Sequence, residues 1–157
     1  MAVRRYAARV VVLDPDNRVL LFNWATKKAG TSSWTTPGGG LEAGEKSREA
    51  AIRELREETG IVVASVEGPV WRGDHFFRSG PDLYHQLESF FLARTEATDV
   101  DTSRLDEFEA AAYLGHRWWS MGEMEQSTAA IYPRGLAGLL RDLLRDGVPP
   151  KVLAIKG

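Results

Sequence analysis

The chain contains no cysteine and only three histidines among its 157 residues. Without thiols it can form neither disulfides nor thiolate-ligated zinc and iron–sulfur centres, so a bound metal needs oxygen or histidine ligands. The absence of cysteine also favours a cytoplasmic protein. A long apolar run is missing as well, because Asp14 ends the first one far short of membrane-spanning length. We therefore expect neither a signal peptide nor a membrane partner.

An excess of charge of one sign is the third feature that the sequence lacks. The formal net charge is −2 at pH 7, which provides no overall attraction for long nucleic acids, and we expect none as a partner. The length and a hydrophobic content of 43% predict a single domain over residues 1–157, without repeats or linkers. The C-terminal stretch 148–156, VPPKVLAIK, leaves an edge strand, a homodimer contact and a simple docked tail as open alternatives.

Hydrophobic patterning and turn residues give a coarse secondary structure. Apolar stretches between turn signals predict strands at 4–13, 18–24, 61–66, 70–77, 83–93 and 116–120. Amphipathic or capped patterns predict helices at 47–59, 121–126 and 133–145. Residues 95–111 are polar and acidic with little periodicity, which predicts a loop. Strands surrounding two substantial helices indicate an α/β fold with a mixed sheet between helices.

The stretch RELREETG, residues 53–60, places Glu54, Glu57 and Glu58 on one face of the predicted helix. Carboxylates at these spacings repel by roughly 0.2 to 0.5 kcal/mol per pair, so helix stability does not explain them. One interpretation is a solvated face relieved by neighbouring arginines. The other is a site for a hard cation, because Mg²⁺ takes oxygen ligands from a few carboxylates, waters and substrate phosphates.

The wider stretch 39–61, GGLEAGEKSREAAIRELREETGI, has glycine, glutamate and an R-E-aliphatic-x-E-E-x-G-aliphatic run at fixed spacings. These positions are filled by Gly39, Glu45, Arg53, Glu54, Leu55, Glu57, Glu58, Gly60 and Ile61. The stretch resembles the Nudix box of the MutT-type (Nudix) hydrolases. The RVLLF strand, the approach from Trp34 to Gly39 and the late HRWWS strand resemble the rest of that family's layout. The resemblance implies the Nudix fold, an α/β/α sandwich with a mixed β-sheet.

The resemblance also implies a reaction and its cofactor. It implies a pyrophosphohydrolase that cleaves a diphosphate linkage of a small-molecule nucleotide with Mg²⁺, for which Mn²⁺ can substitute. Metal ions would neutralise phosphate charge and activate the attacking water. By resemblance the ligands are the carboxylates of Glu54, Glu57 and Glu58 and the backbone carbonyl of Gly39.

Two further roles follow from the resemblance. Arg53 is expected to pair with Glu45 or nearby carboxylates and so to fix the loop–helix–loop. A general base must take the proton of the attacking water. Its candidates are Glu54 and Glu58 inside the box and Glu107 and Glu109 in the acidic stretch outside it.

The substrate pocket is harder to read from the sequence. Its candidates are Trp34, Lys28, Arg78, His85 and Glu88, the last on the same strand face as Tyr84, Gln86 and Phe90. Each has an ordinary alternative, because single cations are commonly solvated, tryptophans commonly pack in cores, and Glu88 can be a polar position on the sheet surface. His75 and His85 are expected either to face each other across a hairpin or to be ordinary strand histidines.

Within the family, extra motifs mark narrow substrate groups, and none is present here. Pro69 is too close to the box and Pro81 too far from it for the ADP-ribose pattern. Phe76 and Phe77 stand where a tyrosine would suggest dinucleoside polyphosphates. A nucleoside triphosphate is therefore the favoured substrate. ADP-ribose, nucleotide sugars, dinucleoside polyphosphates and a non-catalytic sensing module are the alternatives.

Overall fold

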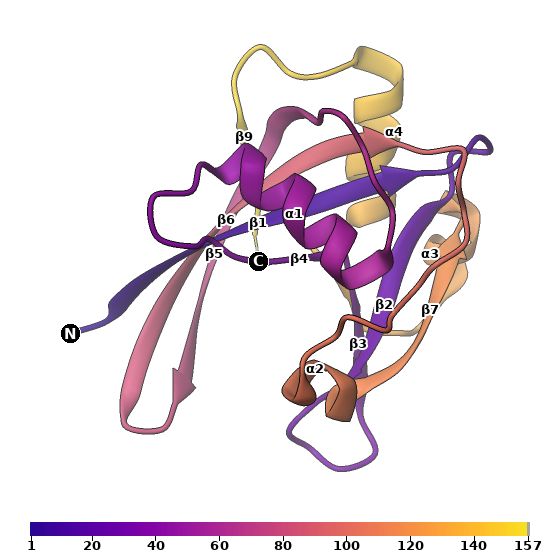
Figure 1. Cartoon of the computed structure of the whole chain (residues 1–157). Helices are drawn as coiled ribbons and strands as arrows, with labels where there is room; N and C mark the ends of the chain where they lie inside the picture. Colours follow the sequence, from indigo (N-terminus) through magenta and orange to yellow (C-terminus); the bar gives the residue numbers. More distant parts are fainter. Residues whose placement is uncertain (157) are drawn as a thin grey trace.

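Strand β1 (Val3–Leu13) runs through the centre of the sheet in the computed structural model, which describes residues 1–156 (Figure 1). It pairs in parallel with β6 (Asp82–Arg94) along its whole length. It pairs antiparallel with β2 (Val19–Ala25) at the turn and with β4 (Gly38–Gly40). Parallel and antiparallel neighbours of one strand make the sheet mixed, as the sequence predicts.

The remaining strands extend the sheet on both sides. Its order is β8-β3-β2-β1-β6-β5-β9, with β4 added to β1 and β7 added to β2. These additional strands are β3 (Ser32–Thr35), β5 (Glu67–Ser79), β7 (Tyr113–Trp119), β8 (Ile131–Tyr132) and β9 (Leu153–Ala154). β9 pairs in parallel with β5 at the sheet edge, so the C-terminal stretch includes the edge strand that was one of its alternatives.

Helices cover both faces of this sheet, which gives the α/β/α sandwich. Helix α1 (Ser47–Thr59) packs over one face through its buried alanines and Leu55. Helices α3 (Met121–Gln126) and α4 (Leu136–Asp146) cover the other face, with the leucine stripe of α4 directed inward. The alternation of β1 supports both layers, because Val10 and Val12 enter the core under α1 whereas Val11 and Leu13 enter the core under α4.

The ends of α1 follow from local capping. Ser47, at which the sequence predicts the helix to begin, is the first helical residue and not the N-cap, which is Lys46, whose N–H is accepted by the Glu49 carboxylate at 3.2 Å. The helix ends at Thr59 as predicted, and Gly60 follows with φ of 76° and its N–H donated to the Arg56 carbonyl at 2.8 Å. This left-handed stop turns the chain away from the helix.

Three predicted elements are wrong. Residues 61–66 form no strand, because Ile61 and Val66 pack individually into the core under α1. The predicted loop 95–111 contains the start of α2 (Glu107–Ala112), a helix without buried residues that is capped reciprocally by Asp106 and Glu109. A short capped helix of this kind has no apolar periodicity to reveal it.

The third error is the start of the last helix. It begins at Leu136 rather than Pro133, because the preceding residues pair with β3 as β8 and then turn through Gly135 at φ of 71°. The amphipathic pattern that predicts this helix is nevertheless confirmed. Leu136, Leu140 and Leu143 are buried, and the two other leucines pack against them.

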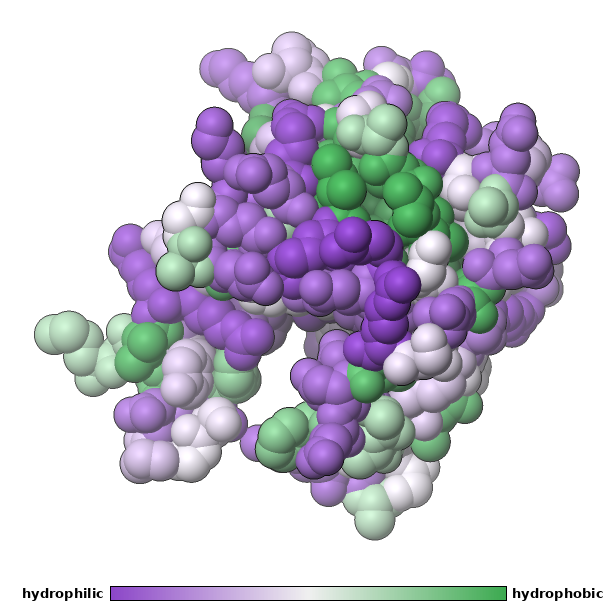
Figure 2. Space-filling model, in the orientation of Figure 1, coloured by the Kyte–Doolittle hydropathy of each residue, from purple (hydrophilic) through white to green (hydrophobic). Residues whose placement is uncertain are grey.

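A hairpin of β5 and β6 projects beyond the two helical layers. Figure 1 shows it extending with the N-terminal end of β1, and Figure 2 shows an opening between this arm and the lower part of the molecule. The Lys27 ammonium, on the β2–β3 loop, donates to the Arg78 carbonyl at the hairpin end, 3.3 Å away. Among residues 1–156, no helix is long and apolar enough to cross a membrane.

Candidate active site

The loop before α1 brings the backbone of β4 against β1. The Val10 N–H donates to the Pro37 carbonyl at 2.8 Å, and Gly38 is buried with φ of 151°. A Cβ at Gly38 would lie 2.2 Å from the Ala8 carbonyl oxygen. This clash could not be relieved by a side-chain movement, because the oxygen belongs to the backbone of β1. Glycine is therefore required there, and its N–H points at the Glu58 carboxylate, 3.4 Å away.

Gly39 lies directly against a box carboxylate. A Cβ at this position would lie 2.7 Å from the Glu54 carboxyl carbon and 2.8 and 2.9 Å from its two oxygens. The missing side chain therefore allows close approach between the Gly39 backbone and this carboxylate. A backbone carbonyl beside a carboxylate is the kind of oxygen pair that hard cations prefer.

Arg53 is the centre of an ion-pair network at the first turns of α1. Its Nε and Nη2 donate to the two oxygens of Glu45, each at 2.8 Å, and Nη2 also reaches the Gly40 carbonyl at 3.1 Å. Its Nη1 donates to Glu54 at 2.8 Å and to Glu57 at 3.1 Å. The bidentate pairing joins the loop before α1 to the helix, as expected for this residue, and lowers the pKa of Glu45.

Glu58 is buried at the bottom of the site. Its residue exposure is 3%, and burial raises its pKa to about 8. Attraction to Arg9 opposes the rise, whereas repulsion from Glu109 and Glu54 adds to it. The attraction to Arg9 therefore offsets only part of the cost of ionising this buried carboxylate.

The other two box glutamates are more accessible. Burial raises the pKa of Glu54 despite its bond to Arg53, and the Glu57 side chain is 43% exposed. Within residues 1–156, no three acidic, histidine or cysteine side chains converge closely enough to hold an ion as they stand. Arg53 instead holds Glu54 and Glu57, so a cation at the box would require their oxygens to turn toward Glu58. The donor set of three carboxylates and the Gly39 carbonyl fits a hard divalent ion.

The outside acidic candidates are separated by the fold. Glu109 lines the cleft that contains Glu58, and burial raises its pKa. Its carboxylate accepts the Asp106 N–H at 3.0 Å. Glu107 is exposed at the start of α2 and is not among the residues that line the cleft. Of the two, the structure brings only Glu109 toward the box.

Two connected compartments lie beside the box. The larger, of about 490 Å³, extends from Glu58 and Gly38–Gly40 to aromatic residues of the arm and of α2. Those aromatic residues are Phe77 and Phe108. The smaller, of about 350 Å³, is more apolar and is lined by Thr35, Thr36, Phe90, Tyr132 and Pro133. Both compartments share Arg9, Thr35 and His75, so they meet at these side chains.

Arg9 and Glu88 form the polar centre between the compartments. Arg9 Nε donates to Glu88 Oε2 at 2.7 Å, and Gln86 Nε2 donates to the same oxygen at 3.2 Å. Burial alone would raise the pKa of Glu88, but Arg9 outweighs it and the pKa is lowered. Sequence reasoning missed Arg9, although a single charged residue inside the apolar run AARVVVL was a usable signal. It also missed Tyr132 and Pro133, which come from a segment distant in sequence.

The remaining predicted pocket residues lie elsewhere. Trp34 packs edge-on against Trp119 at the core under α4, with ring centroids 5.1 Å apart. Lys28 is exposed on the β2–β3 loop, and Arg78 is exposed at the end of the hairpin. His85 does not face His75, because the register places it opposite Phe76. It stacks on that ring and bonds to Asp74 at 2.6 Å, on the other face of the arm.

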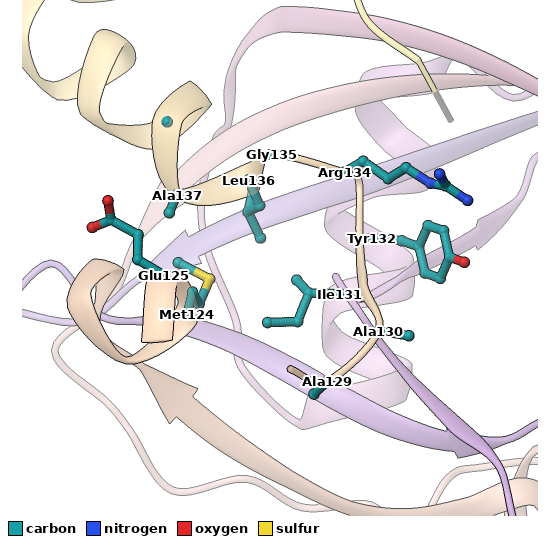
Figure 3. A pocket seen from close by; sticks show the side chains of 11 residues that line it. Met124, Glu125, Ala129, Ala130, Ile131, Tyr132, Arg134, Gly135, Leu136 and Ala137 are labelled. Carbon is teal, nitrogen blue, oxygen red and sulfur yellow. The ribbon is translucent and has the colours of Figure 1, made fainter. Parts of the chain in front are cut away.

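A further hollow of about 520 Å³ lies between α3, β8 and the start of α4. Figure 3 shows its side chains, with Met124, Ile131 and Leu136 turned toward its centre. None of the box carboxylates lines it. The candidate active site is therefore the pair of compartments beside the box and not this hollow.

Comparison with known proteins agrees with this fold. The family model described as NUDIX domain matches residues 3–139. The chain belongs to the Nudix family, and it is a Nudix pyrophosphohydrolase, an enzyme that hydrolyses phosphorus anhydrides.

The curated relatives and solved structures extend over most of the chain. An RNA pyrophosphohydrolase of Halorhodospira halophila is 47% identical over 150 residues, covering 87% of this chain and 80% of the relative. One of Sphingopyxis alaskensis is 34% identical over 137 residues, covering 78% and 81%. The MutT protein of Methanosarcina mazei matches with a TM-score of 0.64 at 17% identity, covering 94% of this chain and 98% of that one. This last likeness shows the fold.

Proposed function

We propose that the protein hydrolyses the polyphosphate of a nucleoside triphosphate with Mg²⁺, releasing a nucleotide and phosphate or pyrophosphate. The observation on which this rests is the buried Glu58 between the Gly38–Gly39 backbone and the other box glutamates. Keeping Glu58 ionised in this buried position is costly without a cation. Its position in an open cleft allows an ion and phosphate oxygens to enter together.

The proposed ligands of Mg²⁺, or of Mn²⁺ in its place, are Glu54, Glu57, Glu58 and the Gly39 carbonyl. The bound cation would neutralise phosphate charge and make the attacking water more acidic. Arg53 would hold α1 in place by keeping its bonds to Glu45 while Glu54 and Glu57 turn from it. The charge-assisted pair of Arg53 and Glu45 would then still fix the loop, and the carboxylates of Glu54 and Glu57 would be free to bind the cation.

In the proposed reaction a water oxygen attacks phosphorus, the bond from that phosphorus to the bridging oxygen breaks, and the leaving phosphate takes the electron pair. A carboxylate must accept the proton of the water. Glu58 and Glu54 remain the candidates inside the box. Glu109 is the remaining candidate outside it, because Glu107 lies away from the cleft.

The smaller compartment supports a nucleoside as the organic part of the substrate. Phe90, Tyr132 and Pro133 form apolar walls, whereas Thr35 and Thr36 add polar groups that a base or sugar can use. Its volume of about 350 Å³ is adequate for one nucleoside. The phosphates would then extend past Arg9 toward Glu58.

A second candidate substrate is the triphosphorylated 5′ end of an RNA. The names of the relatives from Halorhodospira halophila and Sphingopyxis alaskensis favour it. The larger compartment also favours the RNA substrate. This compartment opens between the arm and α2, where the next nucleotide of the RNA could lie. Phe108, which is 89% exposed there, offers a ring on which a base can stack.

The deciding experiment measures phosphate and pyrophosphate release with Mg²⁺ from the four nucleoside triphosphates, ADP-ribose, a dinucleoside polyphosphate and a 5′-triphosphorylated oligoribonucleotide. Glu58→Gln serves as the inactive comparison. Faster release from the free nucleotides supports the first candidate, and faster release from the oligoribonucleotide supports the second. No release from any triphosphate, with the protein folded, would refute both.

A further inference from the structure

The two compartments meet at Arg9, Thr35 and His75, and Arg9 is the arginine among these three side chains. Its side chain is 22% exposed and lines both the nucleoside-sized compartment and the compartment that contains Glu58. It also lies close enough to Glu58 and Glu54 for Coulombic attraction to both. A phosphate chain that links a base in the smaller compartment to the box glutamates would therefore pass beside these three side chains, of which only Arg9 carries a fixed positive charge.

A count of its donors shows what Arg9 has left to offer. A guanidinium has five N–H donors in a rigid plane. Nε donates to Glu88 at 2.7 Å, and Nη1 reaches the carbonyls of Thr36 at 3.3 Å and Gly38 at 3.4 Å. Nη2 has no hydrogen-bond partner or ion pair within the described chain. Two donors of a largely buried cation are thus available to a ligand in the cleft.

Glu88 has no comparable freedom. It is buried, and its Oε2 accepts from both Arg9 and Gln86. Its Oε1 lies 3.4 Å from His75 Nδ1. A carboxylate held on both sides is poorly placed to accept a proton from water. Its evident effect is to fix the plane of the Arg9 guanidinium.

We propose that Arg9 binds the phosphate next to the nucleoside through Nη2, and that Glu88 is the positioning residue that holds Arg9 for this contact. The inference rests on the proposed function and adds to it the residue that joins base recognition to the metal site. The two available N–H groups of Nη2 are fixed in the guanidinium plane that Glu88 orients, whereas a lysine ammonium has no donors fixed in this way. The ordinary alternative is a structural ion pair buried under the sheet surface.

The chain offers a matched control for that alternative. Arg18 Nε donates to the buried Asp14 at 2.7 Å, the same distance and the same nitrogen as in the Arg9 pair. This second pair lies at the β1–β2 turn and lines neither compartment. Arg18→Lys therefore makes the same chemical change in a pair that has no proposed ligand.

The test measures binding of α,β-methylene nucleoside diphosphates of all four bases in metal-free buffer, by calorimetry, with melting temperatures for each variant. We expect Arg9→Lys to weaken the best-bound analogue about tenfold or more, because a charge-assisted hydrogen bond is lost. Glu88→Gln should weaken it too, in a protein that keeps Arg9. Arg18→Lys should leave the affinity within about twofold, since a surface change away from the ligand has little effect.

Steady-state kinetics on the preferred triphosphate give a second measurement. Binding of a phosphate that stays bound through the reaction predicts a raised KM with nearly unchanged kcat in folded Arg9→Lys and Glu88→Gln. Equal affinities of Arg9→Lys, Glu88→Gln and wild type would overturn the proposal, as would absence of analogue binding to the wild type. Because binding is measured without hydrolysis, these outcomes are distinguishable from a failure of the proposed function, in which no triphosphate is cleaved.

Discussion

Arg53 donates from Nε and Nη2 to the two carboxylate oxygens of Glu45, eight residues earlier, at 2.8 Å each. Both side chains are largely buried, at 16% and 13% exposure. The pair fastens the loop before α1 to the helix that contains the box glutamates. The same guanidinium also approaches Glu42, but at 3.6 Å and with an exposed partner.

This difference predicts unequal effects of two similar substitutions. Glu45→Gln should lower the free energy of unfolding by about 1 to 3 kcal/mol, because it weakens a buried, charge-assisted pair. Glu42→Gln should change it by less than about 0.5 kcal/mol, because exposed ion pairs contribute little. Urea denaturation of both variants in metal-free buffer measures the difference, and equal effects would contradict the assigned role of Glu45.

Gly39→Ala should lower kcat/KM by at least about 100-fold. The added Cβ would lie within 2.7 to 2.9 Å of the Glu54 carboxylate and must displace it, and small misplacements of binding groups have effects of this size. The matched control is Gly122→Ala in α3, where an added Cβ meets nothing within 4 Å. That change should leave activity unaltered and raise stability by about 0.5 to 1 kcal/mol. Full activity of Gly39→Ala would show that the close approach is dispensable.

Metal-free protein should respond to pH through Glu58. Its pKa is about 8 in the fold against an ordinary value of 4.5. The protonated form is therefore favoured by folding, and stability falls as pH rises from 4.5 toward 8. The stability of Glu58→Gln should not fall in this way. In chelator, its melting temperature should therefore exceed that of the wild type at pH values near 8 and above.

Adding Mg²⁺ should reverse the order at alkaline pH, because the cation stabilises the ionised wild-type carboxylate and has one ligand fewer in the variant. Glu67→Gln, a neutralisation at an exposed position, is the control and should follow the wild type. Parallel pH profiles of the wild type and Glu58→Gln in chelator would disprove the burial argument.

The turnover of Glu58→Gln and of Glu57→Gln should be lower than that of the wild type by orders of magnitude.

The two acidic residues of α2 should differ in activity. Glu109→Gln should lower kcat at least about tenfold, because this carboxylate lines the cleft beside Glu58. Glu107→Gln should stay within about twofold, since surface substitutions away from a site have small effects. The measurement is kcat with the best triphosphate for each variant. Unaltered kcat in Glu109→Gln would leave the general base inside the box.

Much of the fold was predictable because it depends on local patterns. The apolar run of β1, the extent of α1 and the leucine stripe of α4 are all set by residues close in sequence. The errors are of two kinds: a local pattern that tertiary packing overrides, and an element that has no local pattern. Apolar residues 61–66 resemble a strand but pack singly into the core, and α2 buries no face that periodicity could reveal.

The sequence by itself determined the box. Spacings of three and four residues place its glutamates on one helical face. The glycine at position 39 has no side chain and so permits other groups to approach its backbone closely. Only the tertiary structure decided that Glu58 is buried, that Glu109 rather than Glu107 faces it, and that Arg9 meets Glu88 across 79 residues. Those relationships depend on strand register and on the packing of distant segments, and pairing energies of that kind leave no periodic trace along the chain.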